Sequence, residues 1–274
     1  MKQNIAFIFA GDANHKQHPN CNYFTSFNNT FIQPLIPHFN IHIFIGCGKN
    51  QINGWENKLK NKLDPSINCV IFNELVENDI LRSKSRFSGD ICTNNKKMNF
   101  KIQYGKLHFT WNLVKKYIED NNIIIDYVFK LRYDFIYKED NTFLYEWFKY
   151  LNDNIIATSS TEFHVTDRWS DRTEKDDAYW PKMVSDQLIF GNFMSMNIYF
   201  NLFPCQTVFK SGFFRRKFGM EHILANYLQL NKFQVYAFDL QFSRPGNNWV
   251  LGRNNKWLEE RDNKVKFLQY NYDK

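Results

Sequence analysis

The sequence predicts an α/β fold in which a mostly parallel central sheet is flanked by helices. Short apolar runs end in polar loops at residues 5–10, 41–47 and 69–72, as in strands that are buried on both faces. The segments between these runs are long enough for helices, and residues 104–119 carry apolar side chains at helical spacing. This alternation of buried strands with helices is typical of a parallel sheet.

The helices and the central strand of the N-terminal half follow from the same periodicity. A helix is expected at residues 55–63, between the second and third apolar runs. After the helix at 104–119, an Asp-Asn-Asn break leads into residues 123–131, the most apolar run of the chain. A buried helix that leads into a central strand predicts a Rossmann-type arrangement. The apolar side chains of this helix are Leu107, Trp111, Val114 and Ile118.

The pattern changes beyond residue 134, where two further helices and two further strands are expected. Residues 161–182 are polar and acidic, and we expect them to form a surface loop over a site. No repeat or linker separates two domains, so we expect one domain over residues 1–274. The expected helices are 143–151 and 220–230, and the expected strands are 155–158 and 235–238.

Composition narrows the class of protein. The chain has 274 residues, 43% of them hydrophobic and 18% aromatic, which excludes a largely disordered protein. Lys and Arg number 35 against 28 Asp and Glu, a net charge of +7, so the average surface attracts nucleotides, nucleic acid or acidic lipid headgroups. Five scattered cysteines without a CxxC pair predict reduced thiols and a cytoplasmic protein.

No apolar run of the sequence is long enough to cross a bilayer. Residues 96–101 and 209–218 interleave aromatic and basic side chains. Such stretches can bind an acceptor or the surface of an anionic membrane, and they can equally be ordinary solvated surface. We therefore expect a soluble or peripheral protein.

Several familiar motifs are missing from the sequence. There is no GxGxxG after the first strand, no GxxxxGK[ST], no GxSxG and no HExxH, which argues against a dehydrogenase, a P-loop NTPase, an α/β-hydrolase and a zincin. Residues 46–49, Gly-Cys-Gly-Lys, have the wrong spacing for a phosphate loop, so we predict a strand-end turn there.

The end of the central strand carries a cation and a carboxylate. Arg132 and Asp134 are two residues apart, so an extended strand places them on one face. Ligands of open parallel sheets bind outside the carboxyl ends of the strands. Asp134 can hold Mg²⁺ or Mn²⁺, and the guanidinium of Arg132 adds a fixed positive charge, which suits a nucleoside diphosphate. The alternative is a salt bridge between the two side chains.

Polar residues also precede a short apolar run within residues 185–192. Asp186 and Gln187 stand directly before Leu-Ile-Phe, at the edge of the core. A partly desolvated carboxylate there is a candidate for activating a hydroxyl or for holding a sugar. The alternative is that Asp186 caps a helix or turn.

These segments resemble a known family. Residues 127–134, Tyr-Val-Phe-Lys-Leu-Arg-Tyr-Asp, resemble the YDYVxKxRxD strand of GT-A-type glycosyltransferases from bacterial lipopolysaccharide and capsule synthesis and from large DNA viruses, and Asp126 completes the match. Residues 185–191 are similar to their SDQxxxG segment. Gln103 and Lys106 resemble a Q..K pair ahead of the strand, and Glu221 leads a segment similar to their PE..L..YL helix.

The resemblance implies a GT-A-like Rossmann-type sandwich that transfers a sugar, as a hexosyltransferase, from a nucleoside-diphosphate sugar to a hydroxyl acceptor in glycan biosynthesis. UDP is the expected nucleotide, and manganese or magnesium at Asp134 is the expected cofactor. Arg132 stands where many relatives have the first acid of DxD, and His222 or Asp239 is a candidate to complete the metal site. Residues 1–134 would bind the donor and residues 135–274 the acceptor.

The resemblance also assigns roles to side chains. Asp186 would be the catalytic residue, and Gln187 and Glu221 would bind the acceptor. Several of the residues expected to bind the donor have an alternative interpretation, as part of an ordinary strand-to-loop turn or of a solvated helix face. The residues expected to bind the donor are Ala10, Gly11, Asp12, Gln103, Lys106, Arg132 and Asp134.

Two other functions fit part of the pattern. A nucleotidyltransferase also combines carboxylates, metal and nucleotide on an α/β sheet, but Arg132 interrupts the acid cluster that it needs. A nucleic-acid-binding module suits the net charge and aromatic content, but no RNP-like or helix-turn-helix signature is present. We therefore expect no nucleic-acid partner.

Overall fold

The structure is a computed structural model, and every structural statement below concerns the residues that it describes. These are residues 2–11, 23–59, 62–74, 95–132, 136–137, 148, 151–159, 188–203, 224, 227–228, 230–238 and 242–243.

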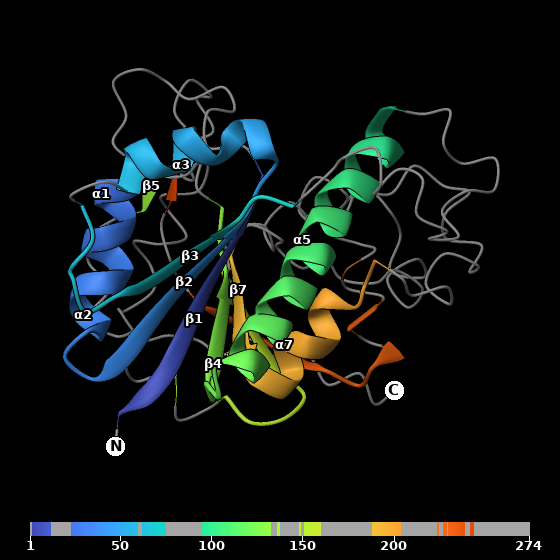
Figure 1. Ribbon diagram of the computed structural model, residues 1–274. Helices are drawn as coiled ribbons and strands as arrows, with labels where there is room; N and C mark the ends of the chain where they lie inside the picture. The colour runs from blue at the N-terminus through green and yellow to red at the C-terminus, as the bar shows by residue number, and fades with distance from the viewer. Residues whose placement is uncertain are drawn as a thin grey trace.

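A seven-stranded sheet lies at the centre of the fold, in the order β3-β2-β1-β4-β7-β6-β8 (Figure 1). Neighbouring strands are parallel except that β7 is antiparallel to both β4 and β6. This mostly parallel sheet confirms the α/β class predicted from the sequence. The strands are β1 (Gln3–Ala10), β2 (Phe39–Gly46), β3 (Asn68–Phe72), β4 (Tyr127–Lys130), β6 (Ile155–Ser159), β7 (Ile189–Asn192) and β8 (Gln234–Phe238). The short strands β5 (Ile136–Tyr137) and β9 (Phe242–Ser243) form a separate antiparallel pair.

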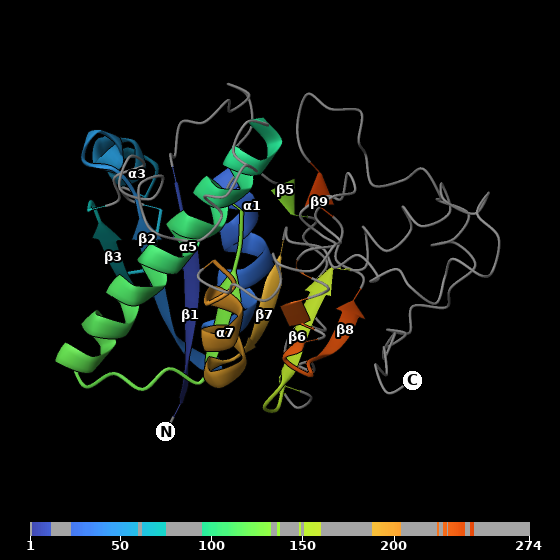
Figure 2. The same cartoon turned by 90° about the vertical axis from the view of Figure 1, so that its right-hand side faces the viewer.

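Helices cover both faces of the sheet. The long helix α5 and the short helix α7 lie side by side on one face (Figure 2). On the other face, α1, a π-helical turn η1 and α2 form one continuous segment. The bounds are α1 (Tyr23–Phe27), η1 (Asn28–Ile32), α2 (Gln33–Leu35), a 3-10 turn η2 (Lys49–Gln51), α3 (Ile52–Leu59), α5 (Asn95–Asp120) and α7 (Phe193–Phe200). None of the described helices has the length and hydropathy needed to cross a membrane.

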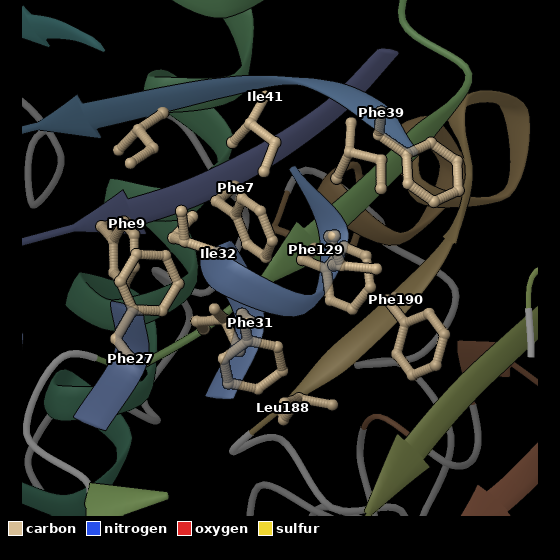
Figure 3. Packing of buried hydrophobic residues seen from close by; sticks show 14 of the residues in the cluster. Phe7, Phe9, Phe27, Phe31, Ile32, Phe39, Ile41, Phe129, Leu188 and Phe190 are labelled. Carbon is tan, nitrogen blue, oxygen red and sulfur yellow. The ribbon is translucent and has the colours of Figure 1, made fainter. Parts of the chain in front are cut away.

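Aromatic side chains fill the face covered by α1 and η1 (Figure 3). The ring of Phe129 on β4 stacks on Phe190 of β7, with ring centroids 4.5 Å apart. Phe7 of β1 meets Phe27 edge to face at 5.3 Å. Offset and edge-on ring contacts add to the free energy of apolar burial. These contacts hold β1, β4 and β7 in one rigid layer.

Helix α5 covers the other face of the sheet. Leu107, Trp111, Val114 and Ile118 are all buried in one cluster with the sheet, as the sequence predicted. Helix α5 connects β3 to the parallel strand β4, so it runs against the strand direction, from the carboxyl edge of the sheet to its amino edge. Its N-terminal part therefore lies at the edge where β1 and β2 end (Figure 1).

Some predicted elements differ from the structure in their bounds. The helix expected at 55–63 is Ile52–Leu59, and the one expected at 104–119 extends over Asn95–Asp120. The strand expected at 123–131 is only Tyr127–Lys130, because the apolar residues before it form the connection from α5. There Asn122 adopts a positive φ of 52° and Ile123 N–H donates to Ile118 O at 2.8 Å.

The predicted strands at 155–158 and 235–238 are confirmed by β6 and β8. The segment α1–α2 and helix α7 are elements that the sequence pattern did not indicate. The surface loop predicted at 161–182 and most of the helices predicted at 143–151 and 220–230 lie outside the described residues.

Candidate functional site at the carboxyl edge

The strand order changes direction between β1 and β4. From β1 the chain moves to β2 and β3 on one side, and α5 then returns it to β4 on the other side. Open α/β sheets bind ligands outside the carboxyl ends of the strands at such a switch point. The candidate site is therefore the edge where β1 and β4 end.

On the β1 side, the backbone turn at Gly11 is held by two hydrogen bonds. Gly11 N–H donates to Gly46 O at 2.8 Å, and Gly11 O accepts from the indole N–H of Trp55 at 3.0 Å. Gly11 has a φ of 122°, a conformation that a residue with a Cβ rarely adopts. The turn after Ala10 is thus held by hydrogen bonds to both backbone polar groups of Gly11, which is itself buried.

On the β4 side, Arg132 lies level with the end of β1. Lys130 is in register with Ile8, and Leu131 N–H donates to Ile8 O at 3.3 Å. Arg132 follows Lys130 by two residues, as Ala10 follows Ile8. The half-buried Arg132 and the turn at Gly11 therefore lie at the same edge on neighbouring strands.

Helix α5 brings Gln103 and Lys106 over this edge. A Cβ at Gly46 would lie only 1.9 Å from Thr110 Oγ1, so Thr110 is in close contact with the last residue of β2. Lys106 and Gln103 lie on the same face of α5 as Thr110. At a rise of 1.5 Å per residue, Lys106 is about 6 Å and Gln103 about 10 Å closer to the N-terminus of the helix than Thr110. Both side chains are half-buried. Both residues therefore lie on the part of α5 that is nearest the carboxyl edge of the sheet.

The structure thus brings together the described members of the predicted donor site at one edge of the sheet. Ala10, Gly11 and Arg132 come from the strand ends, and Gln103 and Lys106 come from α5. The other predicted site residues lie outside the described residues, and their roles stay predictions. These are Asp12, Asp134, Asp186, Gln187 and Glu221, together with the metal candidates His222 and Asp239.

Strands β4 and β7, which belong to the two motifs at residues 127–134 and 185–191, pair with each other. Lys130 is in register with Ile189, and the two strands are antiparallel. The chain that leaves Lys130 toward Asp134 and the chain that enters Ile189 from Asp186 therefore start from neighbouring positions at the carboxyl edge. Thr158 of β6 supports this end of β7 through its hydroxyl, which donates to Leu188 O at 3.0 Å.

Asp126, which completed the sequence match, is not at this edge. Its carboxylate oxygen Oδ2 accepts a hydrogen bond from Asn4 N–H at 2.7 Å, and its carbonyl accepts from Phe193 N–H at 2.9 Å. These contacts join the amino ends of β1, β4 and α7. Asp126 is therefore a structural residue on the side of the sheet away from the candidate site.

Charge is unevenly distributed between the two edges. The carboxyl edge on the α5 side carries Lys106, Lys130 and Arg132. Among the described acids, Glu56 and Glu74 are exposed. An anion at the switch point would therefore meet a positive potential from the described side chains. The described acids at the amino edge are Asp64, Glu119, Asp120, Asp126 and Asp153.

The sequence analysis did not identify Lys130 as a functional residue. It is only 2% exposed, and two signals were available: a lysine inside the most apolar run of the chain, and its match to the lysine of the KxRxD motif. The turn predicted at residues 46–49 is confirmed: Gly46 ends β2, and Gly48 precedes the 3-10 turn η2.

The predicted metal ligands lie outside the described residues. Among the described residues, no three of the His, Cys, Asp and Glu side chains are close enough to hold a metal ion. Burial raises the pKa of the Cys69 thiol to about 11, so this thiol is protonated at neutral pH and is a poor ligand. Asp134 therefore remains the predicted ligand.

Comparisons with known proteins give only structural likenesses. No family model matches the chain, and no curated protein matches its sequence. Mouse xyloside xylosyltransferase 1, in its apo form, is similar over 85% of this chain and 82% of that chain, with 10% identity and a TM-score of 0.48. The galactosyltransferase LgtC, in complex with donor and acceptor sugar analogs, is similar over 82% and 70%, with 15% identity and a TM-score of 0.40.

Proposed function

We propose that this protein is a glycosyltransferase that moves a sugar from a nucleoside-diphosphate sugar, with UDP as the expected nucleotide, to a hydroxyl group of a glycan, glycolipid or glycoprotein. The observation that carries the proposal is the switch point between β1 and β4. There the hydrogen-bonded turn at Gly11 lies on the strand next to that of Arg132, and Lys106 is on the part of α5 nearest this edge.

The described side chains suit the donor half of such a reaction. Gly11 is buried and both its N–H and its carbonyl are hydrogen-bonded, so it would support the donor site by fixing the end of β1 rather than by contact with the nucleotide. Arg132 and Lys106 can bind the oxygens of a diphosphate and stabilise the negative charge that develops as it leaves the sugar. Gln103 offers an amide to the nucleotide from the same helix face.

The acids would supply the remaining chemistry. Asp186 would accept the proton of the acceptor hydroxyl if the enzyme inverts, or orient donor or acceptor if it retains. Gln187 and Glu221 would hold the acceptor. Asp134 would hold Mn²⁺ or Mg²⁺, which when bound neutralises the charge of the diphosphate. A cytoplasmic location, with peripheral contact to a membrane that presents a lipid-linked acceptor, fits this reaction.

Ligand-dependent unfolding tests the donor. The purified chain is heated with UDP, GDP, CMP or TDP, each with and without Mn²⁺, because a ligand that binds only the native state raises the unfolding temperature. One diphosphate should stabilise the protein, more with metal, and Asp134→Ala should reduce the effect. Asp126→Ala is the matched control, since this acid lies at the opposite edge. Equal unfolding temperatures across the panel would contradict the proposal.

Transfer is tested separately from binding. Asp186→Asn should keep the response to the nucleotide and lose sugar transfer, measured as release of nucleoside diphosphate in the presence of acceptor. Unchanged turnover in this variant would remove the role of Asp186. Binding to oligonucleotides that weakens steeply with salt, with no response to any nucleotide, would instead indicate a nucleic-acid-binding module.

A further inference from the structure

Gly46, the last residue of β2, contacts two parts of the candidate donor site. Its carbonyl oxygen accepts a hydrogen bond from Gly11 N–H at 2.8 Å, which holds the turn at the end of β1. On the α5 face of the sheet, a Cβ on Gly46 would overlap the hydroxyl of Thr110 and would lie 2.8 Å from Cβ and 2.9 Å from Cγ2 of that residue. Gly46 therefore joins the β1 turn to helix α5.

The glycine at position 46 is required by space and not by backbone conformation. Gly46 ends a regular strand, and among the described glycines the positive φ belongs to Gly11. Thr110 is completely buried, so its side chain cannot turn away into solvent. Its hydroxyl makes no hydrogen bond within the described part of the chain, so in this contact Thr110 acts through its volume.

Two contacts fix the height of α5 above β2. Tyr117 follows Thr110 by seven residues and shares its face of the helix. The ring of Tyr117 meets Phe44 edge to face, with ring centroids 5.7 Å apart. Phe44 precedes Gly46 by two residues, on the same face of the strand. The spacing at Gly46 therefore determines where the remaining, N-terminal part of the helix lies.

Lys106 and Gln103 belong to that N-terminal part, four and seven residues before Thr110 on the same helix face. We propose that Gly46 is a positioning residue of the donor site. Its lack of a side chain lets α5 lie close enough to the sheet to place Lys106 and Gln103 at the edge where the Gly46 carbonyl holds the β1 turn. The role in nucleotide binding rests on the proposed function, whereas the placement of the helix does not.

Amide hydrogen exchange without any ligand tests the placement of the helix. Gly46→Ala should speed exchange in the N-terminal half of α5, because the added Cβ pushes the helix away from β2. Gly191→Ala is the matched control, since a Cβ there would lie 2.9 Å from Ile155 O and 3.3 Å from Ser195 Cβ, under α7. It should speed exchange in α7 and leave α5 unchanged. Unchanged exchange in α5 of Gly46→Ala would overturn the proposal.

UDP affinity, measured by calorimetry, tests whether Gly46 acts through Lys106. Gly46→Ala should weaken UDP binding about tenfold, the scale of one hydrogen bond to a charged group, and Gly46→Ala/Thr110→Ala should recover most of the affinity. In a Lys106→Met background, Gly46→Ala should have a smaller effect, because the displaced ammonium group is already absent. Gly191→Ala should keep the wild-type affinity. A fully additive loss in Gly46→Ala/Lys106→Met, or an equal loss in Gly191→Ala, would overturn the positioning role.

A variant that folds poorly leaves the test decisive. If Gly46→Ala gives no soluble protein, Gly46→Ala/Thr110→Ser replaces it in both experiments, because the loss of Cγ2 and rotation of the hydroxyl relieve part of the overlap. Failure of Thr110→Ala to restore soluble protein to Gly46→Ala would overturn the contact. If the wild-type protein binds no nucleoside diphosphate, the proposed function fails together with the role of Gly46 in binding, while hydrogen exchange still decides the placement of α5.

Discussion

Trp55 donates a hydrogen bond from its indole N–H to the carbonyl oxygen of Gly11, at 3.0 Å. Trp55 is 1% exposed and also packs against Phe9, with ring centroids 5.9 Å apart. The bond crosses from α3 to the end of β1, so it couples a core side chain to the backbone of the candidate donor site. Because Gly11 also has a positive φ of 122°, the turn depends on this support.

We predict that Trp55→Phe weakens nucleotide binding as well as the fold. The substitution keeps an aromatic ring but leaves Gly11 O without its donor, which costs about 1–3 kcal/mol when the carbonyl is buried. The free energy of unfolding is measured by urea titration, and UDP affinity by calorimetry.

Trp111→Phe is the matched control for this prediction. The indole N–H of Trp111 donates to Asn197 Oδ1 at 2.8 Å, and the residue is fully buried between α5 and α7. We expect a comparable loss of stability with unchanged UDP affinity. If both variants lose affinity equally, the Gly11 turn has no special role in binding.

We predict that Gly46→Ala disturbs the contact between β2 and α5. The added Cβ would lie 1.9 Å from Thr110 Oγ1, and overpacking of this kind costs about 1–3 kcal/mol. The double variant Gly46→Ala/Thr110→Ala should recover part of the lost stability, because it removes the two Thr110 atoms Oγ1 and Cγ2. Urea unfolding of the single and double variants checks this, and additive losses would show that the two residues are not coupled.

We predict that Lys106→Met and Arg132→Met each weaken UDP binding about 10- to 100-fold, since a hydrogen bond to a charged group contributes about 1.5–3 kcal/mol. The dependence of affinity on salt should also fall, because fewer phosphate charges are neutralised. Lys116→Met on the same helix is the control and should change neither quantity. Calorimetry at two salt concentrations measures both, and equal affinities across all three variants would place the diphosphate elsewhere.

We predict that stability falls as the solution is acidified below about pH 6.5, the ordinary pKa of histidine. Burial lowers the pKa of His108 and outweighs the hydrogen bond to the carbonyl of Phe200, which raises it; the nearby charge of Lys115 also lowers it. The unfolded state therefore binds a proton more readily than the folded state, so stability is fully present above the unfolded pKa and is lost as pH falls through the folded pKa. His42 shows the same direction, also from burial.

Unfolding temperatures between pH 7.5 and 5.5 check this prediction. His108→Gln should flatten part of the decline, because it removes one of the two imidazoles whose pKa is lowered by burial. The wild-type protein, measured over the same pH range, is the control. A decline of the same slope in His108→Gln would show that this histidine does not contribute.

Local sequence pattern predicted much of the fold and part of the site. Apolar runs identified β1, β2 and β3, and helical spacing identified the buried face of α5. Gly11 was expected to allow close approach, and its positive φ adds a backbone reason for glycine. These features are predictable because they depend on neighbours within a few positions of the chain.

Other features depended on residues far apart in the sequence. The segment α1–α2 carries no clear periodicity, and its Phe27 and Phe31 are buried because they meet Phe7 of β1. Asp126 matched the family motif along with Arg132, yet the two residues lie at opposite edges of the sheet. A linear motif does not distinguish the two ends of a strand that it spans.

The sequence by itself determined the strand and helix periodicity, the surplus of positive charge and the two acid-bearing motifs. Only the tertiary structure decided that Lys130 and Ile189 face each other on antiparallel strands at the carboxyl edge of the sheet. It also decided that Lys130 is buried rather than solvated. Strand pairing and burial of this kind arise from contacts between distant segments, so no short stretch of sequence contains them.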